Sequence, residues 1–171
     1  MTTSQCWWFT GLPAAGKTTL ASALVQALQL RGEPACLLDG DELRLGLCRD
    51  LGFSPEARHE NMRRVAEIAR VLHQSGIHAV VALVSPTIEG RALACGIIGA
   101  DRFLEIHVAT PLEVCQARDP KGLYARAKAN PGMGMTGVQS VYEKPSHARL
   151  SIDTSVRSVA DSVVALLKLS T

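Results

Sequence analysis

Several features that mark specialised classes of protein are missing from this 171-residue sequence. No uninterrupted apolar stretch approaches the roughly 18 residues of a membrane-spanning helix, and no basic leader segment precedes the first apolar run. No run of five like charges occurs, and the formal net charge is only +2. We therefore expect a soluble, cytoplasmic protein whose partners include neither a membrane nor a nucleic acid.

The cysteines do not have the spacing of a metal site or of a disulfide framework. They are five in number and scattered, without a Cys-x-x-Cys pair: Cys6, Cys36, Cys48, Cys95 and Cys115. An odd, dispersed set of this kind indicates buried free thiols in a reducing compartment.

Short apolar runs alternate with segments of helical periodicity, and this alternation predicts a parallel sheet covered by helices on both faces. We expect strands at residues 6–10, 35–38, 78–84, 103–109 and 148–153. Helical periodicity extends over residues 18–30, 55–74, 89–98 and 156–169. Residues 130–145 have no period and are rich in glycine, so we interpret them as part of a mobile lid within a single domain of residues 1–171.

A glycine-rich loop joins the first predicted strand to the first predicted helix. Gly11, Gly16, Lys17 and Thr18 fill every fixed position of the P-loop pattern. The residues expected to bind the phosphates are those of the whole loop: Gly11, Leu12, Pro13, Ala14, Ala15, Gly16, Lys17, Thr18 and Thr19. Small residues let backbone N–H groups surround a phosphate, Lys17 contacts the β- and γ-phosphates, and the Thr18 hydroxyl reaches Mg²⁺. The sequence therefore predicts binding of ATP or GTP.

Three classes of P-loop protein are compatible with this loop. The Asn-Lys-x-Asp motif with which regulatory GTPases read guanine is absent, as are the additional motifs of larger motor and transporter ATPases. A small-molecule kinase needs only the P-loop, a base, an acceptor pocket and a lid. We favour a kinase over a non-catalytic nucleotide-binding module or a kinase for a neutral alcohol.

Asp39 follows the second apolar run, at the edge of the sheet where α/β proteins bind ligands. Its carboxylate is our candidate for the base that accepts the proton of the attacking hydroxyl, or for a ligand of Mg²⁺ through water. The alternative is a structural turn with Gly40. For Asp41, a metal-linked role and the N-cap of a short helix remain equally open.

Two polar residues of the predicted helix at 55–74 lie in its apolar stripe. Arg58 and Asn61 fall on the same side as Met62, Val65 and the other core positions. Their side chains therefore point inward, beyond the end of the core. An inward arginine beside a phosphate site is either part of an ion pair or a ligand of the acceptor's anion, and we favour the ligand.

The chain resembles the adenylylsulfate kinases, which phosphorylate the 3′-hydroxyl of adenosine 5′-phosphosulfate (APS). The resemblance covers nearly the whole chain and rests on GLPAAGKTT, LLDGDELRLGLCRDLGFSPEARHENMRR, LVSP, TPLEVCQARDPKGLY and MTGVQSVYE. It implies an ATP- and Mg²⁺-dependent kinase of sulfate assimilation that forms PAPS, commonly as a homodimer. We expect an α/β/α P-loop sandwich with five parallel strands in the order 2-3-1-4-5 and a lid at about residues 121–142.

By this resemblance, Asp39 is the catalytic acid–base residue. We expect Mg²⁺ near Thr18, with help from Asp39 or Asp41, directly or through water. Ser85 matches a serine that the family is often described as phosphorylating during turnover. A hydrogen bond to the acceptor is the simpler role, because in-line transfer needs no covalent intermediate. Arg118 is expected beside the donor's adenine. The expected acceptor ligands are Asp41, Arg44, Phe53, Arg58, Asn61, Ser85, Lys121, Gly122, Leu123 and Met135.

The departures from the family pattern gather on the acceptor side. Met135 stands where a phenylalanine usually closes the adenine site opposite Phe53. Thr87 and Ile88 replace an aromatic residue and an arginine, Glu42 replaces an asparagine, and Gln139 replaces an aspartate. A paralogous kinase for a related anionic nucleotide conjugate, such as a cytidine-linked one, is therefore an alternative, as is a catalytically eroded nucleotide-binding module.

Overall fold

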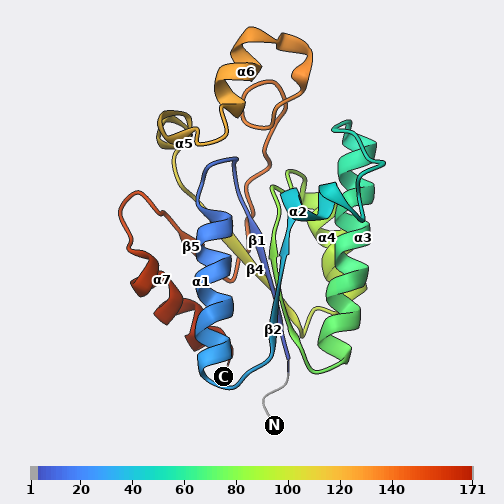
Figure 1. Cartoon of the computed structure of the whole chain (residues 1–171), viewed down its shortest axis with the longest axis vertical. Coiled ribbons are helices and arrows are strands. Elements are labelled where there is room, and N and C mark those ends of the chain that lie inside the picture. The colour runs from blue at the N-terminus through green and yellow to red at the C-terminus, as the bar shows by residue number, and fades with distance from the viewer. Residues whose placement is uncertain (1–3, 171) are drawn as a thin grey trace.

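A parallel sheet forms the middle layer of the computed structural model, which describes residues 4–170 (Figure 1). Within that range its strands are β1 (Cys6–Thr10), β2 (Ala35–Asp39), β3 (His78–Ala82), β4 (Phe103–Val108) and β5 (Leu150–Ile152). They are ordered β2-β3-β1-β4-β5, and every adjacent pair is parallel. The predicted fold class and strand order are confirmed.

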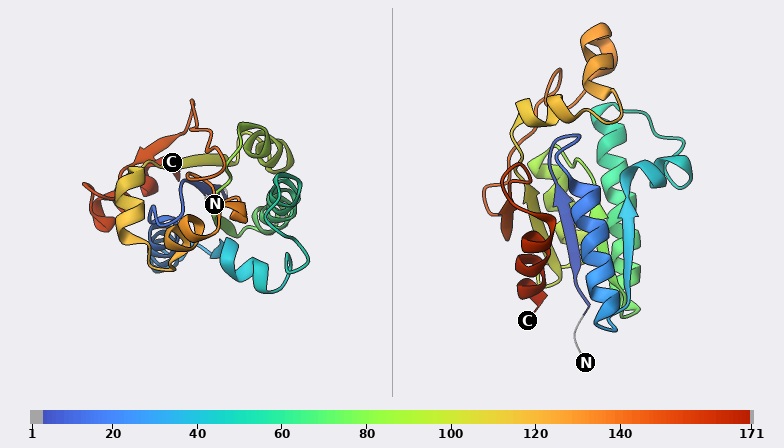
Figure 2. Two further views of the ribbon diagram at one scale, coloured as in Figure 1. Left: turned by 90° about the horizontal axis from the view of Figure 1, so that it is seen from above. Right: turned by 60° about the vertical axis from the view of Figure 1, so that its left-hand side comes forward.

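Helices cover both faces of this sheet. They are α1 (Lys17–Leu30), α2 (Gly40–Leu45), α3 (Pro55–Gln74), α4 (Ile88–Ile98), α5 (Leu112–Arg118), α6 (Leu123–Ala129) and α7 (Val159–Leu167), with 3-10 turns η1 (Pro131–Met133) and η2 (Lys168–Ser170). α1 and α7 pack together on one face, and α3 and α4 on the other (Figures 1 and 2). None of the helices within residues 4–170 is long and apolar enough to cross a bilayer.

The predicted helix boundaries are accurate for α3 and wrong for α7. The predicted span 55–74 is the observed one, whereas α7 begins at Val159 rather than at Val156. The Ser158 hydroxyl accepts a hydrogen bond from the backbone N–H of Asp161 and so caps the helix at this point.

The strands separate two apolar clusters. Trp7 and Phe9 of β1 belong to the cluster beneath α1 and α7, whereas Cys6 and Trp8 belong to the cluster beneath α3 and α4. All four side chains are fully buried. Because helices cover both faces, the strand reads as a continuous apolar run rather than an alternating one. The two tryptophans are core residues.

One end of the sheet carries the loops that are relevant to function. The P-loop follows β1, α2 follows β2, and Ser85 lies just beyond β3. Parallel strands gather their carboxyl ends at one edge, where α/β proteins bind ligands. α5, α6 and the chain that follows them lie beyond this edge, at the top of Figure 1.

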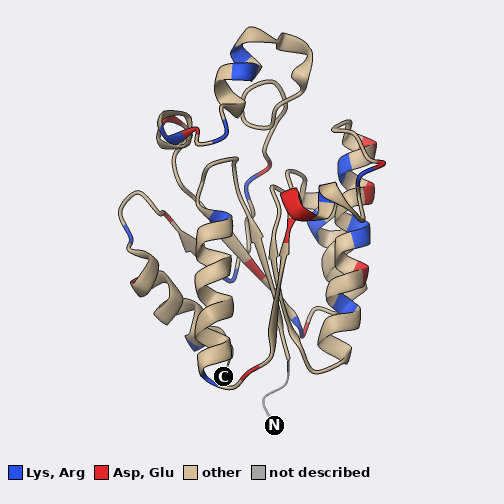
Figure 3. Cartoon of the chain, in the orientation of Figure 1, with Lys and Arg blue, Asp and Glu red and all other residues tan. Residues whose placement is uncertain are grey.

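Basic and acidic side chains alternate on the outer part of α3, where Glu60, Arg63, Glu67 and Arg70 form ion pairs (Figure 3).

Candidate active site

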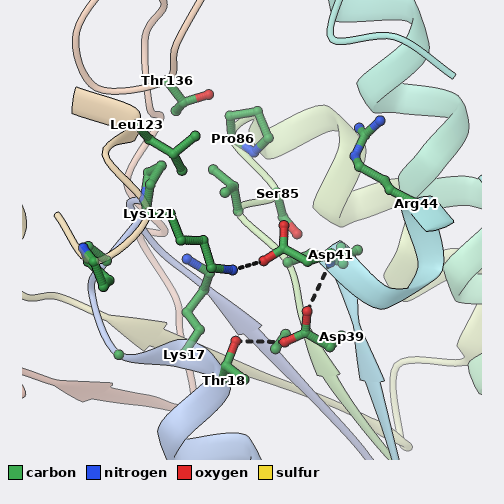
Figure 4. Close-up of a pocket in the computed structure, with 18 of the residues that line it drawn as sticks. Lys17, Thr18, Asp39, Asp41, Arg44, Ser85, Pro86, Lys121, Leu123 and Thr136 are labelled. Carbon is green, nitrogen blue, oxygen red and sulfur yellow. Dashed lines mark hydrogen bonds and ion pairs between the residues drawn. The ribbon is translucent and has the colours of Figure 1, made fainter. Parts of the chain in front are cut away.

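A pocket of about 960 Å³ opens at the carboxyl edge of the sheet. The P-loop, α2, the start of α3, the end of β3 and the α5–α6 region all contribute to its walls (Figure 4). Most of the predicted site residues line it: Pro13, Ala14, Gly16, Lys17, Thr18, Thr19, Asp39, Asp41, Arg44, Phe53, Arg58, Asn61, Ser85, Arg118, Lys121, Leu123 and Met135. The predicted residues that do not line it are Gly11, Leu12, Ala15 and Gly122.

The P-loop packs closely against residues at the carboxyl ends of β4 and β5. A Cβ atom at Gly11 would lie 2.6 Å from the backbone oxygen of Val108, so this position requires glycine. The hydroxyl groups of Thr110 and Thr154 donate to the carbonyl oxygen of Ala15 at 2.9 and 2.8 Å. Sequence reasoning gave these threonines no role: Thr110 begins the family stretch TPLEVCQARDPKGLY without an expected function, and Thr154 belongs to no motif. Their position just beyond two strand ends is the signal that could have found them.

Lys17 lies at the mouth of the loop. Its ammonium group donates to the carbonyl oxygens of Gly11 at 2.9 Å and Leu12 at 2.7 Å. Burial lowers the pKa of Lys17 to about 8, although the nearby carboxylates of Asp41 and Asp39 oppose this shift. The cation is therefore held close to the groups that surround a phosphate in a P-loop.

Asp39 is bonded at both of its carboxylate oxygens (Figure 4). The Thr18 hydroxyl donates to Oδ2 at 2.6 Å, and the backbone N–H of Asp41 donates to Oδ1 at 2.9 Å. The backbone of Asp39 is extended, and its side chain is the N-cap of α2. Our alternative of Asp41 as the N-cap is therefore wrong. Asp41 lies in the first turn of the helix and pairs with Lys121 of the α5–α6 loop.

Two arginines surround the exposed ring of Phe53. The Arg44 guanidinium carbon lies 4.4 Å from the ring centroid, and that of Arg58 lies 5.6 Å from it. The hydrogen bonds that each guanidinium makes go to backbone carbonyl oxygens, including that of Gly134 for Arg58. Carbonyl oxygens do not neutralise the positive charge. This geometry favours the anion-ligand interpretation of Arg58 over the ion-pair interpretation.

Asn61 is a buried polar residue on the wall of the pocket, at 5% exposure. Its Oδ1 atom has no hydrogen-bond partner among the described residues. Buried polar atoms are nearly always bonded, and an unpaired one costs about 1–3 kcal/mol. An unpaired oxygen on the wall of a pocket is well placed to accept a hydrogen bond from a ligand.

Strained backbone is concentrated in the same pocket. Within residues 4–170 the non-glycine residues with positive φ are Ala14 (61°), Ser85 (46°) and Asp119 (24°), and all of them line it. Such strain is characteristic of functional sites. Ser85 Oγ accepts a hydrogen bond from the Trp8 indole at 2.9 Å, which fixes the hydroxyl and leaves its proton available to a ligand. Arg91, which is almost fully buried, donates to the Ser85 carbonyl oxygen at 2.7 Å.

The α5–α6 region closes the remaining side. Arg118 donates to the hydroxyl of Thr154 at 2.7 Å, which places its guanidinium beside the P-loop. Met135 is 5% exposed and lines the pocket together with Thr136, which sequence reasoning also missed. Figure 4 shows Lys121 reaching across to Asp41, two acceptor residues predicted from distant parts of the sequence.

The family model for adenylylsulphate kinase matches residues 3–153. The chain belongs to this family. An adenylyl-sulfate kinase of Shewanella amazonensis is 52% identical over 160 residues, which cover 94% of this chain and 80% of the relative. The enzyme of the same name from Shewanella pealeana is 49% identical over 94% of this chain and 78% of its own length. The family expected from the sequence motifs is thus confirmed.

Solved structures of adenylylsulphate kinases share the whole architecture. An APS kinase from Mycobacterium tuberculosis, described in complex with AMPPNP and APS, has a TM-score of 0.93 and 39% identity to this chain. The match covers 99% of this chain and 98% of that one. A gluconokinase from Sinorhizobium meliloti, at 12% identity and a TM-score of 0.65, shares the fold alone.

Proposed function

We propose that this chain transfers the γ-phosphoryl group of ATP to the 3′-hydroxyl of APS, which yields PAPS and ADP. The observation that carries the proposal is a pocket in which the P-loop, the Asp39 carboxylate that caps α2, and the guanidinium groups of Arg44 and Arg58 meet. The chain that forms it belongs to the adenylylsulphate kinase family. The related M. tuberculosis enzyme, described with AMPPNP and APS together, supports the choice of both substrates.

The donor end of the pocket is formed by the P-loop. Backbone N–H groups of residues 11–19 surround the β- and γ-phosphates, and the positive end of α1 adds to their attraction. Lys17 exchanges its contacts with the loop carbonyls for contacts with the phosphates and stabilises the charge that develops during transfer. Arg118 lies beside the donor's adenine.

The residues around Thr18 are suited to Mg²⁺. The Thr18 hydroxyl and the Asp39 carboxylate are hard oxygen donors 2.6 Å apart, and such oxygens are the ligands that Mg²⁺ prefers. These two residues would hold the ion directly or through water, with Asp41 nearby. When bound, the ion neutralises negative charge on the transferred group.

The acceptor end uses the opposite wall. Asp39 accepts the proton of the 3′-hydroxyl. Arg44, Arg58 and Asn61 bind the phosphosulfate and ribose, and Ser85 adds a hydrogen bond. Phe53 and Met135 enclose the acceptor's base. Lys121, Gly122 and Leu123 of the α5–α6 region make further contacts with the acceptor.

We further propose that residues 1–171 form one domain in which residues 121–142 act as a lid. Closure of the lid excludes water and so protects ATP from hydrolysis. We also propose a cytoplasmic homodimer. A Thiobacillus denitrificans APS kinase, 31% identical at a TM-score of 0.72 over 99% of this chain but 29% of its own, is described as hexameric. Sedimentation velocity of the purified protein distinguishes a dimer from a hexamer.

The decisive experiment measures ADP release from Mg·ATP by the purified protein, with and without micromolar APS. A large APS-dependent rate is the expected result. Slow turnover that does not respond to APS would contradict the proposal, and a panel of cytidine- and adenosine-linked anions would then identify the acceptor. ATP binding without any acceptor-dependent turnover would indicate a nucleotide-binding module.

A further inference from the structure

One side chain fastens the loop at residues 134–140 to α6. The Gln139 Nε2 group donates to the carbonyl oxygens of Ala127 at 2.8 Å and Asn130 at 2.9 Å, at the carboxyl end of the helix. The Gln139 Oε1 atom accepts a hydrogen bond from the backbone N–H of Met135 at 3.1 Å. The amide orientation follows from these partners, because the opposite one would place oxygen against two carbonyl oxygens.

The loop itself is wound around Met135. The Met135 carbonyl oxygen accepts hydrogen bonds from the backbone N–H groups of Gln139 at 2.8 Å and Ser140 at 3.1 Å. The Met135 side chain is directed to the inside and lines the pocket, at 5% exposure. Met135 therefore lies between the Gln139 side chain, which bonds to its backbone, and the pocket, which its own side chain lines.

The next residue indicates that this stretch of the loop faces a ligand. The Thr136 hydroxyl oxygen is buried and has no hydrogen-bond partner among the described residues. Figure 4 shows its side chain at the rim of the pocket opposite Asp39. The loop thus presents an apolar side chain and an unpaired hydroxyl side by side, a combination that suits the face and the edge of a nucleobase.

We propose that Gln139 is a positioning residue for the acceptor: it holds Met135 in the wall against which the acceptor's base packs. The inference rests on the proposed function, since it takes APS as the acceptor. Methionine has three freely rotating side-chain bonds and packs less rigidly than an aromatic ring. The aspartate of the family pattern could donate to neither the Ala127 nor the Asn130 carbonyl oxygen, whereas the Gln139 amide donates to both. The two residues that depart from the family pattern, Met135 and Gln139, are thus joined by a hydrogen bond.

Steady-state kinetics of Gln139→Glu test this role. The variant keeps the length of the side chain and an acceptor for the Met135 N–H, but it turns a carboxylate oxygen toward the carbonyl oxygens of Ala127 and Asn130. We expect the KM for APS to rise about tenfold, the effect of losing one or two hydrogen bonds. The KM for ATP and kcat should stay within about twofold. Gln26→Glu, the same change on the exposed side of α1, is the matched control and should leave all constants unchanged.

A double-mutant cycle with Met135→Ala shows whether Gln139 acts through Met135. If it does, Gln139→Glu adds little to the KM for APS once the methionine side chain is gone. Additive effects of the two substitutions would overturn the proposal. A rise in the KM for ATP as large as that for APS would overturn it too, because it would indicate a general loosening of the lid.

Amide hydrogen exchange separates failure of this proposal from failure of the proposed function. In Gln139→Met, which has no side-chain hydrogen bonds, the Met135 amide should exchange faster than in the wild type. A wild type that uses APS together with a Gln139→Glu variant of unchanged KM would refute the positioning role and leave the function intact. A wild type that ignores APS would refute the proposed function, and the exchange rate would then decide the fastening role alone.

Discussion

The pair Asp39→Asn and Asp39→Ala separates the chemical role of Asp39 from its structural one. The carboxylate caps α2 through Oδ1 and accepts the Thr18 hydroxyl at Oδ2, and the residue is only 8% exposed. Asparagine has the same size, remains a good N-cap and can donate to the Thr18 oxygen. It lacks only the negative charge that a base and a metal ligand require.

The structure gives different magnitudes for the two variants. Alanine removes the cap, at about 1 kcal/mol, and the hydrogen bond from Thr18, at about 1 kcal/mol more. We therefore expect Asp39→Ala to lose about 2 kcal/mol of unfolding free energy, or about 4–8 °C in Tm for a chain of this length. Asp39→Asn should lose less than about 1 kcal/mol, because the cap remains. Both variants should lose kcat by at least about a hundredfold.

Thermal unfolding and APS-dependent ADP release, measured on the same preparations, check both parts. A destabilised Asp39→Ala beside a stable and inactive Asp39→Asn is the expected pattern. If Asp39→Asn turned over at nearly the wild-type rate, the charge would be dispensable. Asp39 would then be a helix cap only, and the assignment of the base would be wrong.

Three further predictions concern the P-loop and its surroundings. Burial lowers the pKa of Lys17 to about 8, so rising pH removes the positive charge that contacts phosphate. The value of kcat/KM for ATP should therefore be constant below that pH and fall about tenfold per pH unit above it. A constant kcat/KM up to about pH 10 would contradict this prediction. In Gly137→Ala the new Cβ would lie 2.6 Å from Leu12 of the P-loop, at a φ of +86°. We expect the free energy of unfolding to fall by about 1–2 kcal/mol and the KM for ATP to rise. An unchanged Tm would show that the structure adjusts to the contact without cost. Arg91 forms an ion pair with Glu105 at 2.6 Å, and Arg91→Met leaves that carboxylate unpaired. Urea denaturation should show a fall of about 3 kcal/mol in the free energy of unfolding. Adding Glu105→Gln to the same chain should restore part of this loss.

Sequence reasoning succeeds where a short pattern determines the direction of a side chain. The spacing in the predicted helix at 55–74 places Asn61 inward, and the structure buries it on the wall of the pocket. The P-loop pattern likewise fixes a local backbone, and Lys17 and Thr18 lie in the pocket as expected. In these cases the helical period or the loop motif contains the necessary information.

It fails where the outcome depends on backbone angles or on distant partners. Asp39 and Asp41 are equally good caps by residue type, and only the extended backbone of Asp39 decides which of them begins α2. The contact of Asp41 with Lys121 and the support of the P-loop by Thr154 join residues far apart in the chain. A single sequence can place such residues at a strand end or in a loop, but it does not show which distant residue each of them contacts.

The departures from the family pattern do not erode the acceptor side of the pocket. Thr87 caps α4, with its hydroxyl accepting from a backbone N–H of the first turn at 3.2 Å, and the side chain of Ile88 is exposed. Neither residue lines the pocket. Glu42 lines it from the first turn of α2, where a carboxylate is favoured by the helix dipole.

Met135, which also lines the pocket, is accompanied by a glutamine that replaces an aspartate and bonds to the Met135 backbone. An eroded site would be expected to lose contacts without gaining others. Here each replacement has a cap, an exposed position or a hydrogen-bond partner of its own. These contacts favour our proposal that this wall binds the acceptor over the alternative of a catalytically eroded nucleotide-binding module.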